Sequence, residues 1–323
     1  MQRAASGATR RTRTLRAALS RTFRRPIAVD VDRFHGYHDH RVPPSYRTTA
    51  TAALTYDQLE THHREKIDAY LDILLDWNTR MNLTAIKDRP TAISRHVNDS
   101  LAVLPAMDRA AAQLSSPASG LRVVDVGSGA GLPGLIFATL RPEWSVTLLD
   151  SLNKRCTFNT AAAEAMGLDN VEILWSRAED AGTNEATREC FDIATARAVA
   201  EVRTLAELCL PLIKVGGYWV APKGPDPEAE VRDGMRAIDI LGGDVDGMRI
   251  ETIAGTGQDM ERTEPGLPPR DGSIDGGNDD GMTTFSDELT EKKPEFTVVT
   301  VHKARPTPAG YPRKANAIKK RPL

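Results

Sequence analysis

Residues 121–134 read LRVVDVGSGAGLPG, a short apolar run that passes directly into a turn rich in glycine. A short run of branched apolar residues is typical of a buried strand, and glycine lets the following turn take positive φ and approach a ligand closely. The stretch therefore predicts a strand, a tight turn and a helix that bind a nucleotide or nucleoside. Gly129, Gly131 and Gly134 also satisfy GxGxxG, which leaves a dinucleotide-binding dehydrogenase open.

Two acidic residues bear on whether the bound molecule is a dinucleotide or a nucleoside with an amino-acid part. Asp125 stands just before the glycines, where a carboxylate suits the amino group of a methionine moiety and would repel a pyrophosphate. Asp150 closes the next apolar run, SVTLLD, and is placed to accept hydrogen bonds from ribose hydroxyls, which both classes of protein need. Asp125 thus favours a methyltransferase over a dehydrogenase.

Beyond the glycines, short apolar runs alternate with helical segments. This alternation predicts βαβ units, and hence an α/β fold in which helices cover both faces of a parallel sheet over residues 120–323. The expected strands are SVTLLD, VEILW, FDIATA, GGYWVAP and EFTVVTVHK, and the expected helices are GLIFATL, KRCTFNTAAAEAMG and TLAELCLPLI.

Before the glycine turn the pattern is helical. Thr55, with a glutamine three positions on, resembles a capping box that opens a helix. Apolar residues over 67–77 recur at spacings of three and four, the period of a helix with one buried face. With a second helix expected over 92–107 and a linker rich in Ser, Pro and Gly at 115–120, residues 54–119 are predicted to form a small helical subdomain.

The net charge of −2 conceals a strong segregation of charge. The first 29 residues hold eight arginines and no acid, residues 302–323 hold seven Lys or Arg and no acid, and residues 255–291 hold ten acids against two arginines. A basic segment rich in Ala, Ser and Thr is the composition of an organelle transit peptide, so residues 1–53 are predicted to be a cleaved leader. A basic arm that binds RNA is the alternative. The acidic stretch, rich in Gly and Pro, is predicted to be a disordered insertion between the last two strands.

Membrane insertion and metal binding are not indicated. No apolar run approaches the roughly 18 to 20 residues that cross a bilayer. Cys156, Cys190 and Cys209 are far apart and form no CxxC pair, and the histidines of HGYHDH lack partners at ligand spacing. We therefore predict a soluble protein with packed thiols and no metal ion.

Two polar segments follow predicted strands at the edge where ligands bind in open α/β sheets. The run Arg177-Ala178-Glu179 comes after VEILW, at the position where such folds contact adenine. Arg197 comes just after FDIATA. Each arginine could instead form a surface ion pair with a neighbouring acid.

Together these residues resemble the GidB family, also called RsmG, of small-subunit ribosomal RNA guanine-N(7) methyltransferases. The resemblance covers most of residues 55–323 apart from the acidic stretch, and it implies a Rossmann-like class I methyltransferase fold that uses S-adenosylmethionine and carries a small N-terminal helical subdomain. It rests on WNTRMNLTAI, RHVNDSL, VVDVGSGAGLPG, LLDSLNKR, GLDNVEILWSRAED, TARAVA, LCLPLIKVGGYWVAPKG and YPRKANAIKKRPL.

The resemblance also implies the residues of the site, which it places in a cleft. Asp99, Lys154 and Arg155 are expected to line that cleft. The predicted catalytic residues, with Arg197 beside the transferred methyl group, are Arg197, Lys223, His96 and Asn82. The predicted cofactor-binding residues, including the acid and glycines above, are Asp125, Gly127, Gly129, Gly131, Leu132, Asp150, Ser151, Leu152, Ala178, Glu179 and Arg197.

Ring nitrogen seven of guanine presents an in-plane lone pair, so a methyl group can pass to it from a sulfonium without a general base, and positioning should dominate catalysis. The chain also lacks the (D/N)PP(Y/F) motif typical of methyltransferases for exocyclic amines and the Pro-Cys pair that serves cytosine carbon five.

The resemblance implies that the partner is small-subunit ribosomal RNA or a 30S-type particle, and we expect the basic residues at 303–321 to contact its phosphates. A methyltransferase for a small molecule or protein and a protein that binds the cofactor only as a scaffold remain alternatives. The leader and the acidic stretch are not typical of bacterial members, so we expect a protein of the chloroplast stroma or mitochondrial matrix. We also expect it to be a monomer.

Overall fold

The computed structural model describes residues 47–49, 53–114, 120–197, 200–253 and 296–323. Most of the predicted leader, the linker at 115–119 and the acidic stretch at 255–291 therefore lie outside the described residues. Residues 47–49 were predicted to belong to the leader but form a strand of the sheet, so the prediction of an unstructured leader through residue 53 is wrong there. Within the described ranges, no helix is both long enough and apolar enough to cross a membrane.

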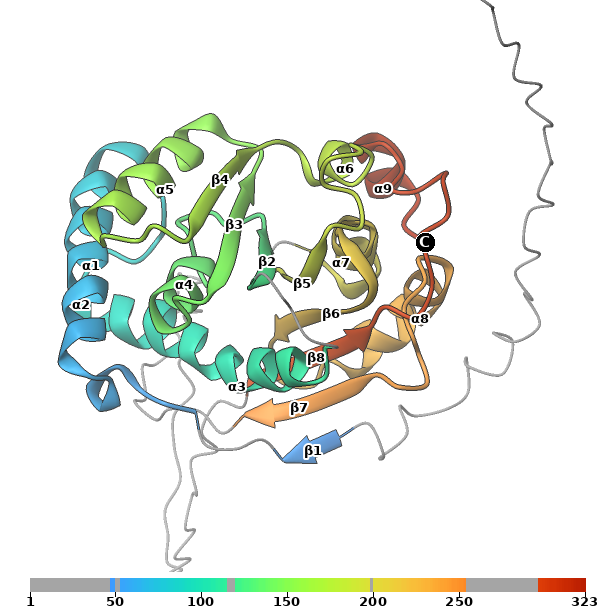
Figure 1. Cartoon of the computed structure of the whole chain (residues 1–323), viewed down its shortest axis with the longest axis horizontal. Helices are drawn as coiled ribbons and strands as arrows, with labels where there is room; N and C mark the ends of the chain where they lie inside the picture. The colour runs from blue at the N-terminus through green and yellow to red at the C-terminus, as the bar shows by residue number, and fades with distance from the viewer. Residues whose placement is uncertain (1–46, 50–52, 115–119, 198–199, 254–295) are drawn as a thin grey trace, which may run out of the picture.

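The described residues contain one eight-stranded sheet, and helices cover both of its faces (Figure 1). The strand order is β1-β7-β8-β6-β5-β2-β3-β4, in which β8 runs antiparallel to both of its neighbours and all other adjacent strands are parallel. The predicted Rossmann-like α/β fold is thus confirmed. The strands are β1 (Arg47–Thr49), β2 (Leu121–Val126), β3 (Trp144–Asp150), β4 (Val171–Trp175), β5 (Phe191–Thr195), β6 (Ile213–Lys223), β7 (Arg249–Ile253) and β8 (Phe296–His302).

The order of the strands reverses at β2. The chain moves outward from β2 to β3 and β4, then returns to the other side of β2 and continues outward through β5 and β6. Open α/β sheets bind ligands at the carboxyl end of such a switch point. The glycine turn that follows β2 lies at this point, between the ends of β3 and β5.

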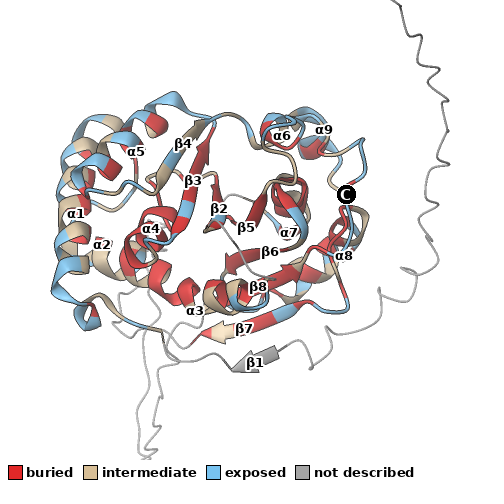
Figure 2. Ribbon diagram, in the orientation of Figure 1, coloured by how far each residue is buried: buried red, intermediate tan, exposed pale blue. Residues whose placement is uncertain are grey.

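Alternate side chains of the central strands enter two separate hydrophobic cores, one on each face of the sheet. In β2, Val123 belongs to the first core and Val124 to the second, as the two-residue period of a strand requires. Figure 2 shows the central strands β2, β3 and β5 as mostly buried, whereas β4 at the edge of the sheet has no buried residue. The first core is covered by α1 (Thr61–Met81), α3 (Asp99–Ala112), α4 (Gly134–Leu140) and α5 (Asn153–Ala165), and the second by α6 (Ala178–Ala181), α7 (Val202–Cys209) and α8 (Glu228–Ile240).

The predicted helical subdomain packs directly on the first face of the sheet. Tyr70 of α1 meets Phe158 of α5 edge to face, with ring centroids 6.4 Å apart. Arg109 of α3 forms an ion pair with the buried Glu251 of β7. Side chains of α1 and α3 therefore share one hydrophobic core with the strands.

The helix expected over 92–107 is part of a longer continuous helical stretch. It begins with α2 (Arg89–Ala92), where the Asp88 carboxylate caps the first turn by accepting from the Thr91 N–H at 2.9 Å. It passes through a π-helical segment, Ile93–Asn98, into α3. Widened turns of this kind are frequent at functional sites, and this one carries His96.

The start of the first helix differs from the prediction. The Thr55 N–H does donate to Gln58 Oε1 at 2.9 Å, but the turn it caps is a short 3-10 helix over Tyr56–Gln58. Leu59 is extended, with ψ of 151°, so the turn ends there and α1 begins at Thr61. The capping interaction was predicted correctly, and the helix boundary was wrong.

The basic C-terminal segment is part of the fold, which corrects the idea that all its cations are available to phosphates. Lys303 is fully buried and donates to the carbonyls of Leu210 and Leu241 at 2.7 and 3.0 Å. Arg313 donates to both carboxylate oxygens of Glu207, which is itself fully buried. Arg305 is exposed but pairs with Asp239. The other exposed cations are Lys314, Lys319, Lys320 and Arg321, on and around α9 (Ala315–Lys320).

Candidate functional site

The glycine turn after β2 is held by the end of β3. The Gly127 N–H donates to the Leu149 carbonyl at 2.8 Å, and the Gly129 N–H donates to Asp150 Oδ2 at 3.0 Å. Gly127, Gly129 and Gly131 all have positive φ, a conformation that residues with a Cβ adopt at a cost. The turn therefore requires these three glycines, and it also requires the acid at the end of the neighbouring strand.

The glycines differ in what surrounds them. A Cβ on Gly131 would lie 2.4 Å from Leu135 Cδ1, and one on Gly134 would lie 2.3 Å from Leu148 Cδ2. A Cβ on Gly129 would meet nothing nearer than the Gly127 carbonyl at 3.9 Å. Gly131 and Gly134 are thus needed for packing, whereas Gly129 leaves space in which a ligand can approach the backbone. Leu132, the next predicted cofactor residue, is buried.

Asp150 organises the surrounding polar groups. Besides accepting from Gly129, its carboxylate accepts from the Leu152 N–H at 2.9 Å and pairs with Arg155 at 3.3 Å. Asp150 and Arg155, both predicted to belong to the site, are therefore brought together. Ser151 and Leu152 follow directly and are exposed, as residues that meet a ligand would be.

Asp125 is fully buried, and its two oxygens have different surroundings. Oδ2 accepts from the Gly134 N–H at 2.9 Å, at the start of α4, whereas Oδ1 has no hydrogen-bond partner. Burial raises the pKa of this carboxyl to about 7. Two further buried oxygens close to the glycine turn, Thr195 Oγ1 and Asn159 Oδ1, also lack a partner, and Thr195 is the register partner of Asp125 in β5.

We expect Asp125→Asn to change how the stability of the protein depends on pH. The pKa of Asp125 is higher in the folded chain than its ordinary value of 3.8, so folded molecules bind this proton more tightly than unfolded ones. This contribution to the free energy of unfolding is complete below the unfolded pKa and is lost as the pH rises towards about 7. Melting temperatures of the two proteins between about pH 5 and 8 should show the wild type losing stability relative to the variant. Parallel profiles would contradict the assignment.

The predicted adenine contacts lie beyond β4. Ala178 and Glu179, at the start of α6, are half-buried, and Arg177 before them is exposed. Trp175, the last residue of β4, was not predicted to belong to the site. It is 62% exposed, and its indole N–H donates to the Ser151 carbonyl at 3.1 Å. An exposed indole fixed in this way offers a flat surface for stacking next to Ser151 and Leu152. The terminal Trp of VEILW was the signal available in the sequence.

A second group of predicted residues surrounds Arg197, which follows β5 and is half-buried. The guanidinium lowers the pKa of His96 and of Asp99, although burial is the larger influence on both. Burial takes the pKa of His96 down to about 4, so this imidazole is neutral at physiological pH, and burial raises the pKa of Asp99. Arg197 also acts electrostatically on Asp125 and on Tyr70, whose hydroxyl donates to the Ala130 carbonyl of the glycine turn at 2.9 Å. The structure thus brings Arg197, His96 and Asp99 together beside the turn.

Asn78, which the sequence analysis did not single out, fixes the loop at 82–86. Its amide donates to the carbonyls of Thr84 and Ile86 at 2.9 and 3.0 Å, and its Oδ1 accepts from the Thr84 N–H at 2.9 Å. Thr84 Oγ1 in turn lies 2.9 Å from His96 Nε2. The side chain of Asn78 therefore sets the position of the imidazole through Thr84.

Three other predicted residues lie at the margin. Asn82 ends α1 in the left-handed conformation, with φ of 47°, and is exposed. Lys154 is also exposed and approaches the Met81 carbonyl at 3.5 Å. Lys223, the last residue of β6, forms an ion pair with Glu230 and donates to the Ala200 carbonyl at 3.1 Å. Because Glu230 also accepts from the Val202 N–H at 2.7 Å, Lys223 holds the start of α7 in place.

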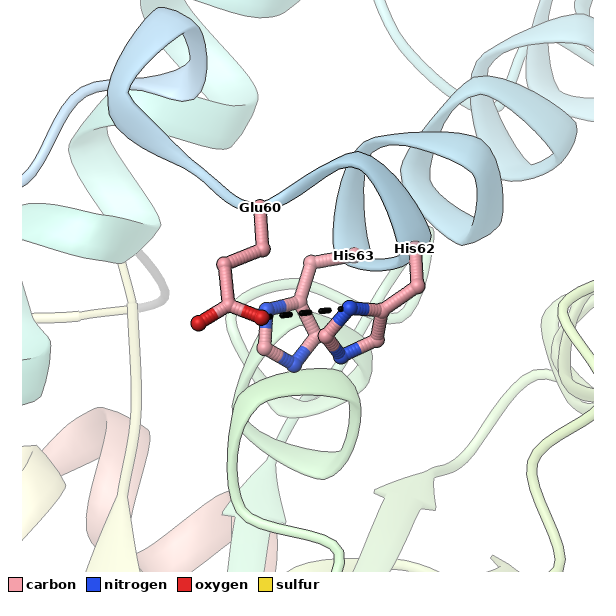
Figure 3. A group of neighbouring side chains, drawn as sticks. All are labelled: Glu60, His62 and His63. Atoms are coloured by element: carbon pink, nitrogen blue, oxygen red, sulfur yellow. Dashed lines mark ion pairs between the residues drawn. The ribbon is translucent and has the colours of Figure 1, made fainter.

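A separate group of possible metal ligands, Glu60, His62 and His63, lies at the other end of α1 (Figure 3). Their ligand atoms lie within 4.8 Å of one another, and His62 pairs with Glu60 at 3.3 Å. The amino end of a helix disfavours cations, and only His63 of the three is not exposed. The group lies at the amino end of α1, before Tyr70, the residue of this helix whose hydroxyl contacts the glycine turn.

The arrangement at the strand ends fits a nucleoside cofactor with a cationic amino-acid part. The turn offers open space at Gly129, and the Asp150 carboxylate has lone pairs left for ribose hydroxyls. Three buried oxygens, those of Asp125, Asn159 and Thr195 described above, have no hydrogen-bond partner. Unpaired buried polar atoms are rare in folded proteins and are usually accounted for by a ligand or ordered water.

Comparisons with known proteins agree with this geometry. The family model GidB, described as rRNA small subunit methyltransferase G, matches residues 63–252. The chain is 39% identical to ribosomal RNA small subunit methyltransferase G of Moorella thermoacetica, over 80% of this chain and 89% of that protein. It is 38% identical to the protein of the same name from Symbiobacterium thermophilum, over 80% of this chain and 89% of the relative.

Proposed function

Because this chain belongs to the GidB family of rRNA small subunit methyltransferases, we propose that it transfers a methyl group from S-adenosylmethionine to ring nitrogen seven of a guanine in small-subunit ribosomal RNA. The observation that carries the proposal is that two sets of residues lie side by side at the switch point of the sheet. The glycine turn held by Asp150 fits the cofactor, and the half-buried Arg197, His96 and Asp99 beside it offer polar groups to a base.

The cofactor would be held by the predicted residues of the turn and the neighbouring strand ends. Asp150 would bind the ribose, Gly129 would allow the amino-acid part to approach the backbone, and Ala178 and Glu179 would lie by the adenine. The cofactor supplies an electrophilic methyl group on a sulfonium. The protein supplies alignment, because the acceptor nitrogen carries its own lone pair and needs no base to expose it.

The groups near Arg197 agree with chemistry that needs no proton transfer. His96, with a pKa lowered to about 4 by burial, stays neutral and is engaged by Thr84. We assign His96 and Arg197 to the binding of the base. Lys223 supports the segment that carries Arg197, and Asn82 supports the loop that carries Thr84.

The finer features of the protein are also proposals. The arginine-rich composition of residues 1–53 supports import into an organelle, and fusing that segment to a fluorescent protein tests it, with diffuse cytosolic fluorescence as the contrary result. The exposed cations around α9 support contact with the phosphates of a ribosomal particle. We propose a monomer, which light scattering tests.

The proposed activity is tested in two steps. Calorimetry should detect binding of S-adenosylhomocysteine and none of NADH, which separates a methyltransferase from a dehydrogenase. Labelled methyl from S-adenosylmethionine should then appear in the RNA of small-subunit particles and not in their proteins. Cofactor binding with no labelled RNA on any particle, from assembling to mature, would overturn the proposal.

A further inference from the structure

Asp99 is an acid with no evident structural partner. It is the first residue of α3, follows the π-helical segment and is half-buried. In the part of the chain that the structure describes, no hydrogen bond or ion pair reaches its carboxylate. Burial of this kind disfavours an unpaired charge and raises the pKa of the group. A half-buried carboxylate is therefore retained here at a cost to stability.

The groups around Asp99 fit a flat polar ligand. Arg197 acts on Asp99 electrostatically, yet the two do not form an ion pair. His96 lies three residues before Asp99, whose backbone N–H donates to the His96 carbonyl, and the imidazole of His96 contacts Thr84 Oγ1 at 2.9 Å. The site thus presents a guanidinium that can only donate hydrogen bonds and a carboxylate that, when ionised, can only accept them.

Guanine matches the carboxylate. One edge of the base carries the acceptors N7 and O6, and the opposite edge carries the donors N1–H and N2–H. A carboxylate can accept from both of these donors at once. Adenine, which also has an N7, presents an acceptor at N1, whose lone pair would face the negative oxygen.

The transfer itself would strengthen such a contact. The bond from sulfur to the methyl carbon breaks with its electron pair returning to sulfur, and a bond from N7 to that carbon forms, so the positive charge moves onto the base. No proton is transferred. A cationic base donates more strongly to a carboxylate, so the contact stabilises the transition state more than the bound substrate.

We propose that Asp99 accepts hydrogen bonds from N1–H and N2–H of the target guanine and thereby selects guanine for methylation. The inference rests on the proposed function. Asp99 would recognise the guanine base, and Arg197 and His96 would contact the same base.

The test compares two proteins on two substrates. Asp99→Asn retains the size of the side chain but presents an amide, and the substrates are particles whose mapped target nucleoside is either guanosine or inosine, which lacks the N2 amino group. Wild-type protein should methylate inosine roughly 10- to 100-fold more slowly than guanosine. Asp99→Asn should be slower than the wild type by a similar factor on guanosine, and nearly indifferent to the loss of the amino group.

Controls separate this inference from the proposed function. Binding of S-adenosylhomocysteine by Asp99→Asn should equal that of the wild type, and Asp57→Asn, which alters an exposed acid, should leave both rates unchanged. Equal wild-type rates on guanosine and inosine would overturn the inference even if the variant failed to fold. So would an Asp99→Asn protein as fast as the wild type. A wild type that methylates no guanosine would overturn the proposed function as well.

Discussion

Gly131→Ala is expected to abolish methyl transfer, with a fall of at least about 100-fold in kcat/KM for the cofactor. The added Cβ would lie 2.4 Å from Leu135 Cδ1 and 3.0 Å from Asn159 Oδ1, at a φ of +83°. Leu135 is buried in α4 and cannot move far, so the turn itself must shift. Isothermal titration with S-adenosylhomocysteine and a methyl-transfer assay measure the effect.

Gly167→Ala is the matched control. Gly167 also has positive φ, at +61°, but an added Cβ would meet nothing within 4 Å, and the residue follows α5 at the end away from the glycine turn. Its backbone strain should cost roughly 1–2 kcal/mol of stability with no change in cofactor affinity. A Gly131→Ala protein that binds the cofactor like Gly167→Ala would refute the account of the turn.

Arg313→Ala is expected to lower the free energy of unfolding by roughly 3–5 kcal/mol, because it leaves the Glu207 carboxylate without its charged partner. Glu207 is fully buried in α7, and Arg313 is its only cationic partner among the described residues. Urea denaturation followed by tryptophan fluorescence measures the change. Deleting residues 303–323 should be more damaging still, since it also removes the buried Lys303.

Arg305→Ala provides the comparison. Arg305 pairs with Asp239 at 2.6 Å, and its side chain is 54% exposed. The loss of such an exposed pair should cost less than about 1 kcal/mol. If Arg313→Ala were no more destabilising than Arg305→Ala, the C-terminal segment would not be the integral part of the fold described above.

The central part of the fold could be predicted because its signals are local. The strands LRVVDV and VEILW appear as β2 and β4 with the expected bounds, since branched apolar runs and glycine act over a few residues. By contrast, β7 was not predicted. Its sequence, RIETI, includes Glu251, and this acid is buried in the sheet only because Arg109 arrives from a distant helix.

The site was predictable where a motif specifies a backbone shape and less so where a contact is tertiary. The positive φ of Gly127, Gly129 and Gly131 follows from the glycine pattern, whereas the hydrogen bond from the Gly129 N–H to Asp150 was not predicted. The hydrogen bond from the Thr84 N–H to Asn78 Oδ1 depends on how the loop folds back onto α1, and no local sequence pattern predicts that.

The C-terminal segment illustrates the same limit. Charge composition indicated a surface for phosphates, yet Lys303 and Arg313 are satisfied by carbonyls and an acid that lie far away in the sequence. Composition alone does not distinguish a cation that awaits a ligand from one already paired within the fold.

The most direct test of the central claim is the identity of the modified nucleoside. Small-subunit particles should be incubated with labelled S-adenosylmethionine and either wild-type protein or Arg197→Ala, then digested to nucleosides and analysed by mass spectrometry. We expect labelled 7-methylguanosine with the wild type and a loss of that product with Arg197→Ala. Label in a different nucleoside, or undiminished 7-methylguanosine with Arg197→Ala, would contradict this expectation.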